Sequence, residues 1–96
     1  MATGQGTATI DFGSTGLNET SIAVTGQTTI SATSKAEAYV MANNTSANRT
    51  ASDHRYFDVM AGLTCGTPTA GTGFTIYATS LQKLTGQYLV NWVWAD

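Results

Sequence analysis

The sequence predicts an all-β protein, a single small β-sandwich or barrel of about seven short antiparallel strands. Two observations predict this class. Apolar and polar residues alternate with a period of two through several short segments, and glycine-containing turns separate these segments along the chain. A length of 96 residues suits one hydrophobic core rather than two. The order of the strands stays open, as does the choice between sandwich and barrel.

The first half of the chain contains four predicted strands, at 7–12, 20–24, 29–32 and 35–42. The second and third are separated by a turn at 25–27, so we expect them to form a hairpin. The fourth segment has the composition of a helix as well, because Ala, Glu, Lys and Met are good helix formers. Its period of two favours a strand.

The second half begins with the most polar segment, 43–53, for which we predict a long exposed loop that contacts something outside the chain. The candidate contact residues in this loop are Asn43, Asn44, Asn48 and Arg49. Segment 55–65 resumes the alternation and is predicted to be a central core strand. Further strands are expected at 74–80 and 87–94.

The last predicted strand has apolar residues on both of its faces. Such a strand is expected to lie in the middle of a sandwich or at an edge that pairs with another subunit. Five aromatic residues are therefore candidate core or subunit-interface residues: Tyr39, Tyr77, Tyr88, Trp92 and Trp94. A row of exposed rings that stacks on sugars or bases is the alternative interpretation.

Charged residues make up 10% of the chain, and the formal net charge is −2. Four scattered Lys and Arg residues do not form a basic patch, so we expect no nucleic-acid binding. No stretch approaches 18 continuous apolar residues, and the first residues lack the features of a signal peptide, so we expect no membrane span and synthesis in the cytoplasm. The single cysteine excludes an intrachain disulfide.

The nearest approach to a metal or acid–base cluster is formed by Asp53, His54 and Asp58. Their spacing is not diagnostic, and we expect a solvated loop with a local cap or ion pair. Cys65 continues an apolar alternation and is expected to be a small buried residue. We therefore predict no catalytic residue, no bound metal and no cofactor.

Two Gly-X-Gly segments, 4–6 and 71–73, lack the following helix that a phosphate-binding loop requires. We expect these glycines to supply the positive φ of turns and bulges.

Several segments resemble the short β-rich structural proteins of tailed-bacteriophage virions: GTATIDFG at 6–13, VTGQ at 24–27, GTGFTIYA at 71–78 and WVW at 92–94. The resemblance implies a capsid decoration or cement protein, commonly a homotrimer. Its partner would be the major capsid protein, and it would lie on the capsid surface after synthesis in the host cytoplasm.

Residues 1–6 are polar and contain glycine, so we expect a flexible arm that orders on binding, followed by a single β domain at 7–96. The alternative function is a tail-fibre or receptor-binding module that recognises carbohydrate through the 43–53 loop and exposed tyrosines.

Overall fold

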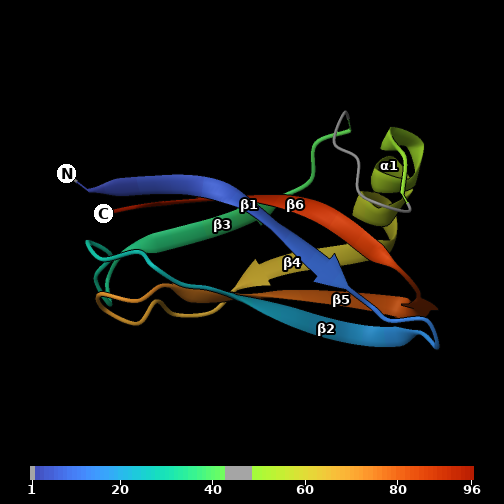
Figure 1. The fold of residues 1–96 in the computed structure, drawn as a ribbon, viewed down its shortest axis with the longest axis horizontal. Coiled ribbons are helices and arrows are strands. Elements are labelled where there is room, and N and C mark those ends of the chain that lie inside the picture. The colour runs from blue at the N-terminus through green and yellow to red at the C-terminus, as the bar shows by residue number, and fades with distance from the viewer. Residues whose placement is uncertain (1, 43–48) are drawn as a thin grey trace.

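The structure of the chain, a computed structural model, describes residues 2–42 and 49–96. Two three-stranded antiparallel sheets pack face to face in this part of the chain (Figure 1). In chain order the elements are β1 (Thr3–Asp11), β2 (Leu17–Val24), β3 (Lys35–Tyr39), α1 (Ala51–Met60), β4 (Ala61–Cys65), β5 (Phe74–Leu84) and β6 (Gln87–Ala95). The predicted all-β fold is confirmed, and the two packed sheets make it a sandwich.

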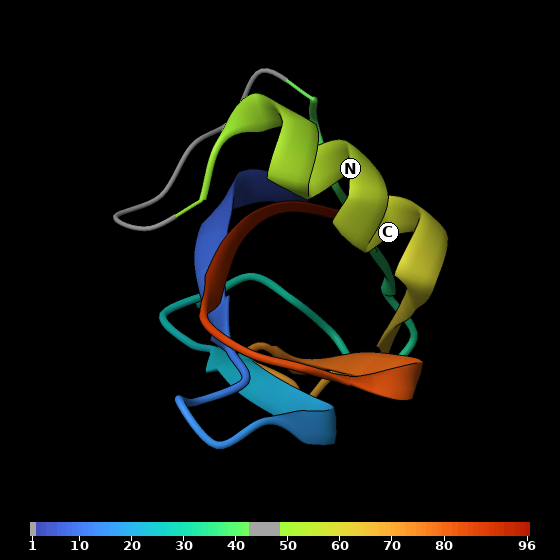
Figure 2. The same ribbon diagram turned by 90° about the vertical axis from the view of Figure 1, so that its right-hand side faces the viewer.

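The strand orders are β1-β6-β3 in one sheet and β2-β5-β4 in the other. The two central strands, β5 and β6, follow one another in sequence, and the short turn between them carries the chain from one sheet to the other. Contacts of β1 with β2 and of β3 with β4 bring the sheet edges together on both sides (Figure 2). The last strand is therefore central within its sheet. This is the first of the two predicted positions, the middle of a sandwich or an edge that pairs with another subunit.

The inward faces of both sheets and the inner face of α1 form one core. Period-two alternation buries every second residue of β6, and of β5 as far as Ser80, while their other residues are partly or fully exposed. The buried apolar residues are Ile10, Phe12, Val24, Ile30, Ala38, Phe57, Ala61, Phe74, Ile76, Ala78, Tyr88, Val90, Trp92 and Trp94.

Two glycines of β1 make room for the two tryptophans of β6. Gly4 lies opposite Trp94 and Gly6 opposite Trp92 in the strand register. A Cβ atom on Gly6 would come within 2.5 Å of the Trp92 ring, and one on Gly4 would overlap the Trp94 indole nitrogen. The expectation of positive φ is therefore wrong for this glycine pair, since the described residues with positive φ include neither. It is confirmed for the glycines at 71 and 73, with φ of 73° and 156°.

The predicted central strand at 55–65 is wrong, because its first half belongs to helix α1 and its second half is β4, an edge strand. Thr50 caps the helix: its hydroxyl accepts from the backbone N–H of Asp53, and the Asp53 carboxylate accepts from the N–H of Thr50. This reciprocal capping favours helix formation directly after Thr50. The predicted loop at 43–53 therefore ends earlier than expected, and its positions 43–48 lie outside the described residues.

Two further expectations are corrected. Segment 29–32 is not a strand and does not pair with β2, whose partner is β5. Local hydrogen bonds hold it instead: Ile30 N–H donates to the Gln27 carbonyl, and Ser31 N–H donates to the Ser34 hydroxyl. Serine side chains that bond nearby backbone groups compete in this way with sheet formation.

The flexible arm expected at 1–6 is also wrong for most of its length. Strand β1 begins at Thr3, and each of its residues has a partner in β6. Pairing over the full strand satisfies the backbone groups that a free arm would expose to water. The β domain therefore includes positions 3–6.

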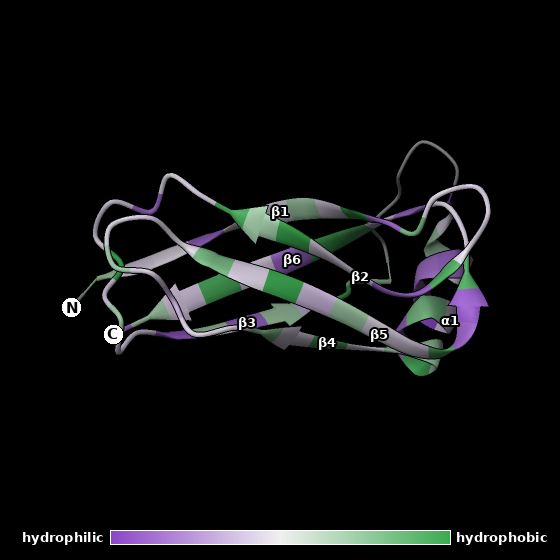
Figure 3. Ribbon diagram, turned by 90° about the horizontal axis from the view of Figure 1, so that it is seen from below, coloured by the Kyte–Doolittle hydropathy of each residue, from purple (hydrophilic) through white to green (hydrophobic). Residues whose placement is uncertain are grey.

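The sandwich has two different ends (Figure 3). At one end, which we call the helix end, α1 lies beside the turn that follows β1 and the turn that follows β5. Backbone bonds join these two turns, from Phe12 N–H to the Gly86 carbonyl and from Gly86 N–H to the Gly13 carbonyl. The opposite end, the terminal end, carries both chain termini and the loops that follow β2 and β4.

Candidate functional site

Three of the predicted interface residues lie inside the core of a single chain. Tyr88, Trp92 and Trp94 are all buried. Both indole N–H groups are satisfied within the chain, since Trp92 donates to the Thr7 carbonyl (3.3 Å) and Trp94 to the Gln27 side chain (2.9 Å). Of the two predicted positions, core or subunit interface, the structure shows the core for these three rings, because the described chain already covers them.

The two remaining aromatic candidates, Tyr39 and Tyr77, lie on opposite faces of the molecule. Tyr39 is on the outer face of the β1-β6-β3 sheet with 42% of its surface exposed, and Tyr77 is on the outer face of the other sheet with 41% exposed. The sandwich core separates them. The structure therefore contains no continuous row of tyrosines at these positions.

Among the predicted loop contacts, Arg49 is described, whereas Asn43, Asn44 and Asn48 lie outside the described residues. The Arg49 guanidinium donates to the carbonyl and hydroxyl oxygens of Thr85 and lies 5.1 Å from the centre of the Tyr88 ring. It also covers Gly86, where any Cβ would overlap it. Arg49 thus fastens the start of α1 to the turn between β5 and β6.

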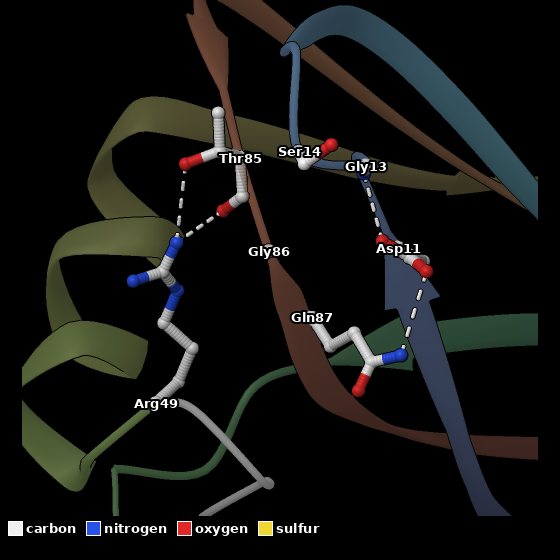
Figure 4. A pocket seen from close by; sticks show the side chains of 7 residues that line it. All are labelled: Asp11, Gly13, Ser14, Arg49, Thr85, Gly86 and Gln87. Atoms are coloured by element: carbon white, nitrogen blue, oxygen red, sulfur yellow. Dashed lines mark hydrogen bonds between the residues drawn. The ribbon is translucent and has the colours of Figure 1, made fainter.

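A polar pocket of about 440 Å³ lies beside this turn (Figure 4). Asp11 and Gln87 lie on one side of it, and Arg49 and Thr85 on the other. One Asp11 oxygen accepts from Gly13 N–H at 2.7 Å, and the other accepts from the Gln87 amide at 3.4 Å. Both charged groups of the pocket therefore bond to the turns around them, which is a structural use of these side chains.

Asp53, His54 and Asp58 do not form a reactive cluster. The hydrogen bond from the Thr50 backbone holds the pKa of Asp53 below its ordinary value, while Asp58 points into solvent. His54 is fully buried, not part of a solvated loop as expected. Leu89 N–H donates to its Nε2 at 2.9 Å, which leaves Nδ1 to carry the proton and donate to the Thr50 carbonyl at 2.7 Å. Both ring nitrogens are thus occupied by backbone groups.

The thiol of Cys65 is half-buried on β4 and points toward the sandwich interior. Burial raises its pKa, and the carboxylate of Glu37 adds to the effect. A raised pKa keeps the thiol protonated at neutral pH, and the protonated form is a poor nucleophile.

Sequence reasoning missed a surface at the helix end that carries exposed apolar side chains. Tyr56 and Val59 on α1 are 72% and 82% exposed, and Leu81 on β5 is 98% exposed. α1 contacts β5, and Ala61, the first residue after α1, pairs with Ser80, next to Leu81. We call these three residues the apolar end surface. The sequence signal for this surface was the i, i+3 spacing of residues 56 and 59. It is recognised only once the segment is interpreted as a helix.

Within residues 2–42 and 49–96, no group of three or more His, Cys, Asp or Glu side chains is arranged to hold a metal ion. The helix of this part of the chain is too short and too polar to cross a membrane. No protein-family model, curated protein or solved structure matches the chain.

Proposed function

We propose that the chain is a structural protein of a tailed-bacteriophage particle, a decoration or cement protein that lies on the capsid surface and stabilises contacts between major capsid subunits. The observation that carries this proposal is the apolar end surface. Three large apolar side chains are exposed at this end of the molecule, and exposed apolar patches mark protein interaction sites. The resemblance of the β-rich segments to virion proteins supports the choice of partner.

The helix that carries Tyr56 and Val59 of the apolar end surface packs on the core beneath it. Phe57, on the inner side of α1, stacks on Tyr88 with ring centres 4.3 Å apart, and Phe12 packs edge-on against both rings. The opposite side of the same helix presents Tyr56 and Val59. A surface that is already ordered loses little conformational entropy on binding, which favours affinity.

Charges of both signs border this surface. Arg55, which bonds to the Ser52 hydroxyl, and Asp58 lie on the exposed part of α1, and Lys83 follows Leu81 in β5. A mixed polar rim around apolar residues is typical of protein–protein interfaces. This composition favours a protein partner over the phosphate backbone of a nucleic acid, which would select a uniform positive charge.

The proposal includes a homotrimer, but its subunit contacts must differ from those expected from the sequence. Trp92 and Trp94 are buried within one chain, so neither ring is free to reach a neighbouring subunit. Light scattering of the purified protein tests this part. A mass three times the 10.0 kDa of one chain supports the trimer, and a stable monomer at high concentration contradicts it.

Capsid binding is tested by mixing the purified protein with expanded, undecorated heads of the phage that encodes it, followed by sedimentation. We expect co-sedimentation and a higher temperature of particle disruption. Leu81→Asp places a charge in the apolar end surface at a nearly fully exposed position, so the fold tolerates it while binding falls. Burial of one such leucine contributes about 2 kcal/mol, which corresponds to roughly thirtyfold in affinity.

The matched control is Ala23→Asp, which adds the same charge at an exposed position of β2 near the terminal end. It should bind heads as the unmodified chain does. Failure of the unmodified chain to co-sediment contradicts the proposal. Equal binding by the two variants would show that the apolar end surface is not the contact.

A further inference from the structure

The outer face of the β1-β6-β3 sheet carries a second pocket, of about 340 Å³, beside Tyr39. Its lining comes from all three strands of the sheet: Gln5, Gly6 and Thr7 from β1, Tyr39 from β3, and Asn91 and Trp92 from β6. The Trp92 ring and the Cβ direction of Gly6 both point into the core, so these two residues contribute backbone to the pocket floor. The walls are the side chains that point outward.

The wall residues are brought together by the strand register. Asn91 on the central strand has Thr7 as its partner on one side and Tyr39 on the other. Directly paired residues on one face of a sheet have Cβ atoms about 5 Å apart. A hydroxyl, an amide and a phenol ring therefore stand in one row across the sheet, with the Gln5 amide in the next row.

The amide of Asn91 has an unmet hydrogen-bond requirement. Its Nδ2 atom is buried and has no acceptor among the described residues. An unpaired buried N–H costs about 1–3 kcal/mol, so such groups call for an explanation. The terminal torsion of an asparagine side chain is broad. Rotation about this torsion would turn the donor toward an acceptor in the pocket, which Asn91 lines.

Among the described residues, no charged side chain lines the pocket. The closest charge along β3 on the same face is the carboxylate of Glu37, two residues from Tyr39. This carboxylate disfavours an anionic ligand, because nothing cationic in the lining would compensate for the repulsion. The ligand that fits is neutral, bears several hydroxyl groups and has an apolar face for the half-exposed Tyr39 ring.

We propose that this pocket binds a neutral sugar. The hexose ring presents C–H groups to Tyr39, while its hydroxyls accept from Asn91 and exchange hydrogen bonds with Gln5 and Thr7. The pocket volume lies at the lower end of the range for small-molecule sites, which suits one sugar residue at the end of a longer glycan. This site is separate from the apolar end surface, and its function is independent of capsid binding.

The test is a titration of the full-length, ¹⁵N-labelled protein with methyl glycosides of glucose, galactose, mannose and N-acetylglucosamine. We expect saturable shifts of the amide signals of Gly6, Thr7, Tyr39 and Asn91 with at least one of the four. Methyl sialoside should cause none, because its carboxylate meets Glu37. The absence of saturable shifts with all four neutral sugars overturns the proposal, as does equal affinity for the sialoside.

Two substitutions locate the site. Tyr39→Ala should weaken binding about tenfold by removing the ring that packs against the sugar. Tyr77→Ala is the matched control, since Tyr77 has almost the same exposure on the opposite sheet, and it should leave the affinity unchanged. Unchanged affinity in Tyr39→Ala, or an equal loss in both variants, contradicts this location.

A third variant separates binding from folding. Asn91→Leu removes the unpaired amide, so the melting temperature should stay the same or rise while sugar affinity falls severalfold. Retained affinity in a folded Asn91→Leu variant shows that the amide takes no part and overturns its assigned role.

Discussion

The two ends of the sandwich are closed by different kinds of interaction. At the helix end, the rings of Phe12, Phe57 and Tyr88 pack against one another in the core. At the terminal end, where Trp94 is buried, a charged group also takes part: the Asp96 carboxylate accepts from the Ser34 hydroxyl at 2.7 Å and from Ala2 N–H at 3.1 Å. Apolar packing in the core is compatible with a solvent-exposed surface directly above it. The hydrogen bonds at the terminal end, in contrast, depend on the charge of a carboxylate.

This difference bears on function. The helix end combines apolar packing beneath α1 with exposed apolar side chains on the same helix, which would keep the proposed contact surface ordered before a partner binds. The terminal end carries both chain termini and the hydrogen bonds of a charged group. We therefore expect truncation of a helix-end core ring to lower stability far more than loss of the Asp96 carboxylate, which should change mainly the dependence of stability on pH.

The largest effect is expected from Phe57→Ala, which removes the ring that attaches α1 to the core. Truncation of a buried phenylalanine costs about 3–5 kcal/mol of unfolding free energy. Tyr56→Ala, on the exposed side of the same helix, should cost far less. Urea denaturation of both variants measures the difference. Similar losses would mean that α1 is held by something other than its inner face.

The second effect concerns the polar contacts within the helix end, as distinct from its ring packing. His54→Leu keeps the bulk of the side chain but leaves Leu89 N–H without its acceptor. An unpaired buried donor costs about 2 kcal/mol. Asp58→Asn, on the exposed side of α1, serves as the control and should change the free energy of unfolding little. A neutral His54→Leu variant would show that water or a rearranged backbone replaces the imidazole.

The third effect concerns the start of α1. Thr50→Ala removes the hydroxyl that accepts from Asp53 N–H, and we expect a loss of about 1 kcal/mol in unfolding free energy. Thr50→Ser keeps the hydroxyl and should lose only a few tenths of that. If both variants behave alike in denaturation, the helix does not depend on this cap.

The smallest expected effect is a change in how the stability of the terminal end depends on pH. The hydrogen bond from Ser34, followed by that from Ala2 N–H, holds the pKa of Asp96 below its ordinary value. A lowered folded-state pKa gives stability that is present above the unfolded pKa of about 3.9 and is lost as the pH falls through the folded value. Asp96→Asn should therefore lower the melting temperature at pH 7 and converge with the unmodified chain in acid. A constant difference across the acid range would contradict this assignment.

Asp53 provides the equivalent comparison at the helix end. The pKa of its carboxylate is also lowered, first by the Thr50 backbone N–H, so its contribution has the same sign. Asp53→Asn should likewise converge with the unmodified chain in acid. Melting curves of both asparagine variants over the same pH series show whether acid loosens one end before the other.

The strands that alternate cleanly could be predicted from the sequence, and the helix could not. β4 follows α1 without an intervening loop residue, since Met60 ends one and Ala61 begins the other. The real alternation of Ala61, Leu63 and Cys65 therefore continued backward through Phe57 and Val59, where it coincided with a strand pattern by chance. The capping pair at positions 50 and 53 was the local signal against it.

Long-range pairing was the other limit. The turn at 25–27 suggested a local hairpin, but the partner of β2 is β5, about fifty residues later. The role of Gly6 likewise depends on its register opposite Trp92. Local turn chemistry specifies neither. The residues of the proposed sugar site were not grouped by the sequence for the same reason. Tyr39 was identified as a candidate contact residue, but nothing in the sequence placed it beside Asn91 and Thr7.

The meeting of Ala2 and Asp96 has a consequence for the topology of the chain. Besides the bond between Ala2 N–H and the Asp96 carboxylate, Asp96 N–H donates to the Ala2 carbonyl at 3.1 Å, so the described ends of the chain are hydrogen-bonded neighbours. Ala2 and Asp96 thus lie side by side. A short linker across this gap would allow new ends to be opened in the exposed loop around residue 70, in a circular permutant that keeps every strand intact.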